Sequence, residues 1–293
     1  MVDAGIVIEQ IITGLSIGSW LFLVAIGLSL VFGVLGVLNF AHGVLFAIGA
    51  YVAVTTVQSA VGNFWIGVVA AAVVVGVIGL VIEMGFIRQL YGRAEEDLDQ
   101  LLLTFAFVLI IEDIIRIIFG SGTRQMSPPA VFGFTVSAAG FSIPAYRLFV
   151  IAVSFTVMGA ILVTLKTTNF GRLVRATSSD RDMASLLGVN VPRLYTMVFV
   201  IGAALAGIGG AFAAPLQSVT PALGETVIIE AFVIVVIGGL GSFVGTFIGA
   251  YLVGLMIAVG SIFAAGAGEL FPFIALIAVL LLKPEGLVGG AEA

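Results

Sequence analysis

Residues 169–193 read NFGRLVRATSSDRDMASLLGVNVPR and form the one long charged stretch of a chain that is otherwise strongly apolar. The sequence has eleven Lys and Arg residues, and four of them lie in this stretch: Arg172, Arg175, Arg181 and Arg193. Apolar segments of membrane-spanning length flank the stretch on both sides. Because positive charge collects on the cytoplasmic side of membrane proteins, residues 166–193 are predicted to form a cytoplasmic loop.

Composition places the chain among the polytopic membrane proteins. Hydrophobic residues make up 61% of the sequence and charged residues 9%, with a mean hydropathy of +1.30, whereas soluble domains carry about 25% charged residues. At about 20 apolar residues per crossing, we predict an all-α integral membrane protein of about 8–10 transmembrane helices, in a single domain over residues 1–293. The apolar segments are 6–37, 40–60, 64–87, 99–119, 147–165, 194–216, 226–240, 243–262 and 266–282.

The first of these segments is too long for one straight crossing. We expect it to tilt, to break near Gly33 and Gly36, or to include an interfacial piece. The glycine-rich run at residues 238–241 is expected to be either a tight turn or a helix break at membrane depth.

Basic residues orient the segments. One side of the predicted bundle has three of them, Arg116, Arg124 and Arg147. The other side has eight: Arg88, Arg93, Lys166, Arg172, Arg175, Arg181, Arg193 and Lys283. The richer side is predicted to be cytoplasmic, which places the C-terminus inside a multi-pass protein of the cytoplasmic (inner) membrane. Because Arg88 is the first basic residue, no cleavable signal peptide is expected.

Residues 120–146 contain three prolines and four glycines and have no helical period. They are predicted to form an external loop. This loop is either a plain connector or part of a docking surface for an extracytoplasmic partner.

The basic loop carries the signature of a short helix at about residues 179–188. Ser179 is the predicted N-cap, with Asp182 at the third helical position as in a capping box. Gly188 is placed to stop the helix. Three apolar residues recur on one face at helical spacing: Met183, Leu186 and Leu187. The stability of such a short helix is marginal when it is isolated. The helix is therefore expected either to dock into a groove of a partner or to lie on lipid headgroups.

Asn39 and His42 are unusual polar residues in an apolar neighbourhood, and His42 is the single histidine of the chain. No Asp, Glu or Cys lies at ligand spacing from it, so no metal site is expected. Two interpretations remain open. The side chains cap broken helix backbone inside the membrane, or they line the path of a transported substrate.

Small residues at four-residue spacing are typical of helices that pack closely in lipid. Two such stripes are present: Gly202, Ala206 and Gly210, and Gly241, Gly245 and Gly249.

Four acidic residues within or beside the apolar segments have structural interpretations. Glu112 and Arg116 are spaced to form an i, i+4 salt bridge. Glu83, near the cytoplasmic end of its segment, is expected to be structural. Glu225 and Glu230 flank a predicted helix start, where acids favour the positive end of the dipole.

Several classes of function are excluded. The chain has no cysteine, no visible cluster of catalytic residues and no cofactor motif, so it is not predicted to be an enzyme. The Gly239-Leu240-Gly241 run lacks the Gly-Lys-Ser/Thr of a phosphate-binding loop, so energy must come from another chain. Membrane lipid surrounds the protein, and no basic stripe of the kind that binds nucleic acid is present.

Residues 182–188, DMASLLG, resemble a divergent form of the EAA-xxx-G loop of ABC importer permeases. Asp182, Ala184 and Gly188 match the Glu, the second Ala and the Gly of that pattern, whereas Met183 departs from the first Ala. In that family the loop is a coupling helix that seats in a cleft of the ATP-binding subunit. The residues that the resemblance and the helix signature assign to this contact are Ser179, Asp182, Met183, Ala184, Leu186, Leu187 and Gly188.

Other motifs are similar to those of one branch of that family, the branched-chain amino acid permeases. They are NFGRLVRA at 169–176, FVIGAALAGIGGA at 199–211, GVLGVLNFAHG at 33–43 followed by GAY at 49–51, GGLGS at 238–242 and KPEGLVG at 283–289. The resemblance implies an ABC importer permease architecture and import of branched-chain amino acids, or of urea and short amides as in close relatives. It also implies a second homologous permease, two ATP-binding subunits and an extracytoplasmic substrate-binding protein.

An ion-coupled secondary transporter is a further alternative. Such a protein is expected to show an inverted repeat and paired membrane carboxylates. No convincing repeat is present in this sequence.

Overall fold

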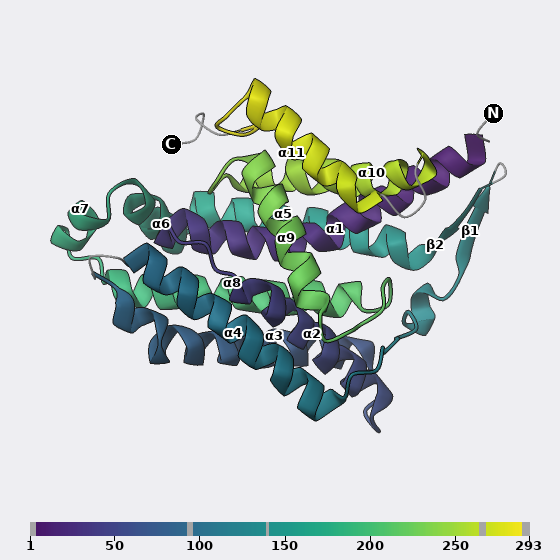
Figure 1. Ribbon diagram of the computed structural model, residues 1–293, viewed down its shortest axis with the longest axis horizontal. Coiled ribbons are helices and arrows are strands. Elements are labelled where there is room, and N and C mark those ends of the chain that lie inside the picture. Colours follow the sequence, from purple (N-terminus) through teal and green to yellow (C-terminus); the bar gives the residue numbers. More distant parts are fainter. Residues whose placement is uncertain (1–3, 93–95, 139–140, 264–267, 289–293) are drawn as a thin grey trace.

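The computed structural model describes residues 4–92, 96–138, 141–263 and 268–288. Within them, each of the nine predicted apolar segments corresponds to one helix (Figure 1). These are α1 (Ala4–Leu35), α2 (Ala41–Gln58), α3 (Phe64–Gly85), α4 (Glu96–Phe119), α5 (Ala145–Thr167), α8 (Val191–Ala213), α9 (Leu223–Gly238), α10 (Phe243–Phe263) and α11 (Phe271–Leu282).

Six of these helices are long and apolar enough to cross a membrane: α1, α2, α3, α5, α8 and α10. Of the other three, α9 and α11 are shorter, and α4 contains five acidic residues and Arg116. The prediction of an all-α polytopic membrane protein is confirmed.

Shorter elements lie at the two ends of the bundle. Two helices, α6 (Asn169–Ser179) and α7 (Arg181–Leu186), connect α5 to α8 at one end. A hairpin of β1 (Thr135–Ala138) and β2 (Phe141–Pro144) lies near the N-terminus, at the opposite end from α7 (Figure 1). Three 3-10 turns complete the described chain: Ile87–Leu90, Ala130–Phe132 and Gly268–Leu270.

α1 is one unbroken helix of 32 residues. At 1.5 Å per residue it is about 48 Å long, whereas the hydrocarbon core of a bilayer is about 30 Å thick. The helix must therefore tilt or project beyond the core. It ends at Leu35, directly before Gly36, which has a φ of +76°. Of the outcomes expected for this segment, a break near Gly33 and Gly36 therefore does occur, at Gly36.

α1 and α8 form the centre of the bundle. α1 packs against α10, α8 and α5, and α8 packs against α3, α1 and α2. Most residues of α3 and α5 are exposed or only half-buried. On α3 the exposed side chains include a valine stripe at four-residue spacing, Val69, Val73, Val77 and Val81. Exposed apolar stripes of this kind fit contact with lipid, which is as apolar as the side chains themselves.

Small residues let α8 approach its neighbours at backbone distance. A Cβ built on Gly202 would lie 2.9 Å from the Gly27 carbonyl oxygen of α1. A Cβ on Gly210 would lie 2.1 Å from the Phe46 carbonyl oxygen of α2. Ala206, between them, is fully buried. All three residues of this stripe therefore lie in the packed interior.

The second predicted stripe divides between a turn and a helix. Gly245 and Gly249 lie on α10, where a Cβ on either would approach a carbonyl oxygen of α9 to 2.0 Å or 2.7 Å. Gly241 instead lies in the turn before α10, because its φ of +81° suits a turn and not a helix. The run at 238–241 is thus a tight turn between α9 and α10.

Three of the sequence motifs meet at this turn. The amide of Leu287 donates to the Ile237 carbonyl at 2.8 Å, and the amide of Val288 donates to the Gly238 carbonyl at 3.1 Å. Gly33 of α1 packs directly against Gly241. The 33–43 and 238–242 motifs and residues 283–288 of the last motif therefore pack together locally.

The 120–146 segment is not wholly irregular, in contrast to the prediction. β1 and β2 pair antiparallel, with Val136 opposite Ile143. The amide of Ser142 donates to the Glu9 carboxylate at 2.7 Å, and Arg124 forms a backbone bridge to Val219. Backbone pairing of the short extended runs was masked in the sequence by the surrounding Gly and Pro.

We predict that Gly210→Val prevents correct folding, because the added carbons would overlap the backbone of α2 and cost about 1–3 kcal/mol or more. Gly159→Val is the matched control, since a Cβ at Gly159 on α5 meets nothing within 4 Å. The yield of monodisperse protein after detergent extraction and its thermal midpoint are the measurements. Equal behaviour of the two variants would contradict the packing described above.

Candidate functional site

The α7 helix begins one residue later than its sequence signature suggests. Ser179 is the last residue of α6, and the N-cap of α7 is Asp180, whose carboxylate accepts a hydrogen bond from the Met183 amide at 2.8 Å. Asp182 is consequently the second helical residue. The predicted capping box of Ser179 and Asp182 is wrong, because residues 169–179 already form a helix and the chain turns at Asp180.

α6 is itself amphipathic and packs back onto the end of α5. Its N-cap is Thr168, whose hydroxyl accepts from the Gly171 amide at 3.2 Å. Gly171 lies directly against the Leu165 backbone, and the Arg175 guanidinium donates to the Leu165 carbonyl oxygen. The sequence prediction placed a single helix in this loop, whereas the structure has two.

The C-terminal end of α7 follows the prediction. Gly188 has a φ of +88° and ends the helix. The Val189 amide donates to the Ala184 carbonyl at 3.1 Å, and the Gly188 amide donates to the Ser185 carbonyl at 3.0 Å. This pair of bonds is the Schellman motif, which satisfies carbonyls left open at a helix end.

One face of α7 is apolar and exposed. Ala184 is buried against the rest of the chain, whereas Met183, Leu186 and Leu187 are 52%, 82% and 79% exposed. We call these three side chains the α7 stripe. The α7 helix lies at one extreme end of the molecule (Figure 1). A helix of six residues with so little of its apolar surface covered has the properties of a binding element.

α7 is fixed to the bundle by aromatic and polar contacts. The Arg181 guanidinium lies 5.3 Å from the ring centre of Tyr195 and 6.0 Å from that of Tyr91. The Tyr91 hydroxyl donates to Glu83 at 3.1 Å, and the Thr196 hydroxyl donates to the other Glu83 oxygen at 2.7 Å. Contacts therefore run from α7 through these side chains to α3 and α8.

Sequence reasoning anticipated a structural Glu83 but missed its partners. Glu83 is fully buried, and a buried carboxylate requires hydrogen-bond donors. That requirement is the signal that could have directed attention to the hydroxyl groups of Tyr91 and Thr196. The predicted salt bridge between Glu112 and Arg116 is present, and Glu112 also interacts with Glu225 of α9.

Asn39 and His42 lie at the start of α2, and both are buried. The Asn39 side-chain oxygen accepts from the Ala41 amide at 3.0 Å, so Asn39 does cap helix backbone. The His42 ring lies against Gly27 and beside the Val24 carbonyl of α1. Neither ring nitrogen has a hydrogen-bond partner within the described chain. His42 thus occupies a tight contact between α1 and α2.

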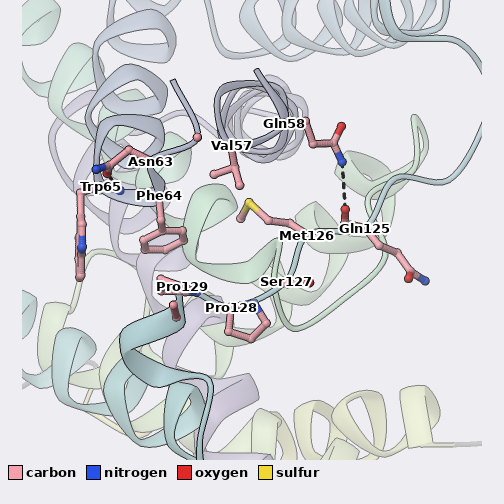
Figure 2. A pocket seen from close by; sticks show the side chains of 12 residues that line it. Val57, Gln58, Asn63, Phe64, Trp65, Gln125, Met126, Ser127, Pro128 and Pro129 are labelled. Carbon is pink, nitrogen blue, oxygen red and sulfur yellow. Dashed lines mark hydrogen bonds between the residues drawn. The ribbon is translucent and has the colours of Figure 1, made fainter. Parts of the chain in front are cut away.

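A cavity of about 520 Å³ lies at the other end of the bundle (Figure 2). Residues of the α2–α3 connection face those of the 125–130 segment across it, and the Gln58 amide donates to the Gln125 carbonyl at 3.2 Å. Its apolar lining comes from Val57, Phe64, Trp65, Met126, Pro128 and Pro129. In the described part of the chain no group of three His, Cys, Asp or Glu residues could hold a metal ion.

Comparison with known proteins assigns the chain along nearly its whole length. Residues 10–282 match the family described as branched-chain amino acid transport system / permease component. The chain is 30% identical to the high-affinity branched-chain amino acid transport system permease protein LivH of Salmonella typhimurium, over 97% of this chain and 96% of LivH. It is 30% identical to the corresponding protein BraD of Pseudomonas aeruginosa, with the same coverage. A probable LivH of Methanocaldococcus jannaschii is 26% identical over 92% of the chain and 88% of that protein. No solved structure matches.

Asp180→Ala should loosen α7, because loss of an N-cap costs about 1 kcal/mol and so raises amide exchange about fivefold. Ser179→Ala is the matched control, since Ser179 caps nothing. Hydrogen exchange of the peptide covering residues 180–188, measured on the intact protein in detergent, distinguishes the two variants. Faster exchange in Ser179→Ala alone would show that the cap is assigned to the wrong residue.

Proposed function

Because this chain belongs to the family of permease components of branched-chain amino acid transport systems, we propose that it is the membrane permease subunit of an ATP-driven importer of branched-chain amino acids. The observation that carries the proposal is the match over residues 10–282. The bundle of apolar helices supports it independently. Urea or a short amide is the alternative cargo, and an ion-coupled mechanism has no support in these features.

The ATP-binding subunits are proposed to contact α7. Three observations support this placement: the α7 stripe is exposed, the helix is capped at both ends, and basic residues lie within and on either side of it in the sequence. Leu186 and Leu187 are the expected anchors, with Met183 beside them, while Asp182, Ala184 and Gly188 hold the helix in shape. Ser179 serves only as the end of α6. A second homologous permease subunit and a second ATP-binding subunit complete the proposed assembly.

The end of the bundle with α7 and residue 288 is proposed to face the cytoplasm. It carries Lys166, Arg172, Arg175, Arg181 and Lys283, among other basic residues, and positive charge favours that side. The start of α1 lies at the opposite end of the bundle from α7 (Figure 1) and is therefore proposed to lie outside. The 120–146 segment lies outside as well.

An extracytoplasmic substrate-binding protein is proposed to dock over the cavity of Figure 2. The cavity lies at the proposed outer end and combines aromatic, proline and amide side chains. Aromatic residues and Met are enriched at protein interfaces. Trp65 is 45% exposed there, which supports a contact with a partner.

Asn39 and His42 are proposed to hold the start of α2 next to the translocation path. Asn39 contributes its backbone hydrogen bond. His42 contributes its packing against Gly27, the same residue that contacts Gly202 of α8. Burying a polar imidazole ring among apolar helices costs free energy, and residues of this kind in membrane proteins generally have a function.

Uptake by the assembled transporter tests the cargo. The permease, its partner permease, the ATP-binding subunits and the binding protein are reconstituted in vesicles and supplied with labelled leucine, isoleucine, valine, urea or a hexose. We expect ATP-dependent accumulation of the three amino acids, at least about tenfold above urea and hexose, since a tenfold ratio needs only 1.4 kcal/mol of discrimination. Vesicles without ATP are the control. Accumulation of urea alone would assign the chain to an amide transporter, and accumulation of the hexose alone would refute the proposal.

A further inference from the structure

A second cavity, of about 370 Å³, lies between the outer halves of α1 and α9, the start of α5 and the segment that joins α8 to α9. It is at the end of the bundle opposite α7 and shares no lining residue with the cavity of Figure 2. Its volume falls within the range of sites that hold small molecules, at the lower end. Unlike most of the bundle interior, it is bordered by groups of both charges.

Hydrogen-bond donors converge on one part of this cavity. The Arg147 guanidinium donates to the Thr13 hydroxyl, and both residues line the cavity. A guanidinium has five N–H donors, so others remain to bind an anion. Glu9 attracts Arg147 electrostatically, but the Glu9 carboxylate accepts from the Ser142 amide and is not part of the lining.

Gln217 adds a second donor. Its amide nitrogen is buried and has no hydrogen-bond partner within the described chain, and the residue lines the same cavity. Buried polar atoms are satisfied in the great majority of cases. An unsatisfied amide beside an arginine therefore indicates a place for an oxygen atom of a ligand.

An acidic group borders the cavity as well. Glu230 of α9 follows Leu223 and Val227 at helical spacing, and all three residues line the cavity. Glu230 is partly buried. Ionisable residues at such depth in a membrane protein generally serve a substrate or ion. The cavity thus presents a carboxylate as well as a guanidinium.

Most of the remaining lining is aliphatic. It comes from Ile17, Leu216, Leu223, Val227 and Ile257. A cation, an anion and a branched aliphatic wall are the complement of one class of ligand, a free α-amino acid with an aliphatic side chain.

We propose that this cavity is a binding site for such an amino acid in its zwitterionic form. Arg147 and Gln217 receive the carboxylate, Glu230 receives the ammonium group, and the aliphatic wall receives the side chain. The identification of the ligand class rests on the proposed function, whereas the site itself follows from the cavity. It lies at the proposed outer end, where cargo delivered by a binding protein would enter.

Trp20 provides a direct reporter of occupancy. The chain has two tryptophans, and Trp20 lines the cavity whereas Trp65 lines the other one. In the full chain carrying Trp65→Phe, Trp20 is the single tryptophan. The protein is placed in nanodiscs of anionic phosphatidylglycerol, so that no zwitterionic lipid headgroup competes. Its fluorescence is then titrated with leucine, with isoamylamine, which lacks the carboxylate, and with 4-methylpentanoate, which lacks the ammonium group.

Leucine should change Trp20 fluorescence saturably, and each of the two half-ligands should bind at least about tenfold more weakly, because each lacks one of the two charged groups that the proposed site binds. Glu230→Gln should weaken leucine binding about tenfold. The same variant should also reduce the preference for leucine over 4-methylpentanoate, a change that a merely structural role would not produce. The titration is then repeated in nanodiscs of zwitterionic lipid. Weaker leucine binding in these nanodiscs would indicate that lipid headgroups compete for the site.

Glu225→Gln is the matched control. It makes the same change of charge on the same helix, outside the cavity lining, and it keeps a hydrogen bond with Glu112 possible. Leucine titration of this variant should match that of the parent.

Absence of a Trp20 response, equal binding of the three ligands, or equal effects of Glu230→Gln and Glu225→Gln would each overturn the site. Because the ligand series needs only the Trp65→Phe background, the test remains decisive even if Glu230→Gln fails to fold. If the assembled transporter takes up leucine equally well with and without Glu230→Gln, the proposed function stands and this site alone is refuted.

Discussion

The structure depends on close approach of helix backbones at small residues. In lipid no hydrophobic force drives helices together, so packing contacts must do so. Gly202 against Gly27 and Gly210 against Phe46 place α8 at backbone distance from α1 and α2. Contacts of this kind leave no room for helices to slide independently. We infer that the centre of the bundle moves as a rigid body when it moves at all.

This rigidity gives the position of α7 its significance. The helix is fixed to the bundle through Arg181, Tyr91 and Glu83, and its apolar stripe points away from the chain. A force applied to the stripe is therefore passed to α3 and α8 and not absorbed by a loose loop. The proposed amino acid site lies at the opposite end of the bundle, so the same rigid helices connect the two.

Much of the fold could be predicted from the sequence, because apolar length alone locates helices in a membrane protein. All nine apolar segments became helices, and the stop at Gly188 was evident from the residue type. The N-cap was misplaced by one residue because Ser179 and Asp180 are both good caps, and only the end of α6 decides between them. The need of Glu83 for hydrogen-bond donors could be anticipated, but the choice of Tyr91 and Thr196 as those donors could not. The convergence of Arg147, Gln217 and Glu230 was not predictable either. These contacts join segments far apart in the chain and depend on how the helices are rotated.

The most direct measurement of the central claim, that α7 couples the permease to ATP hydrolysis, compares uptake and ATPase activity in a double variant of the assembled transporter. Leu186→Asp with Leu187→Asp places two charges in the α7 stripe. Ser185→Asp, an exposed position on the other side of the same helix, is the matched control. The account predicts that the double variant inserts and assembles but loses at least about tenfold in uptake per ATP hydrolysed, because charge is depleted at the cores of protein interfaces. Uptake equal to that of the Ser185→Asp control would contradict it.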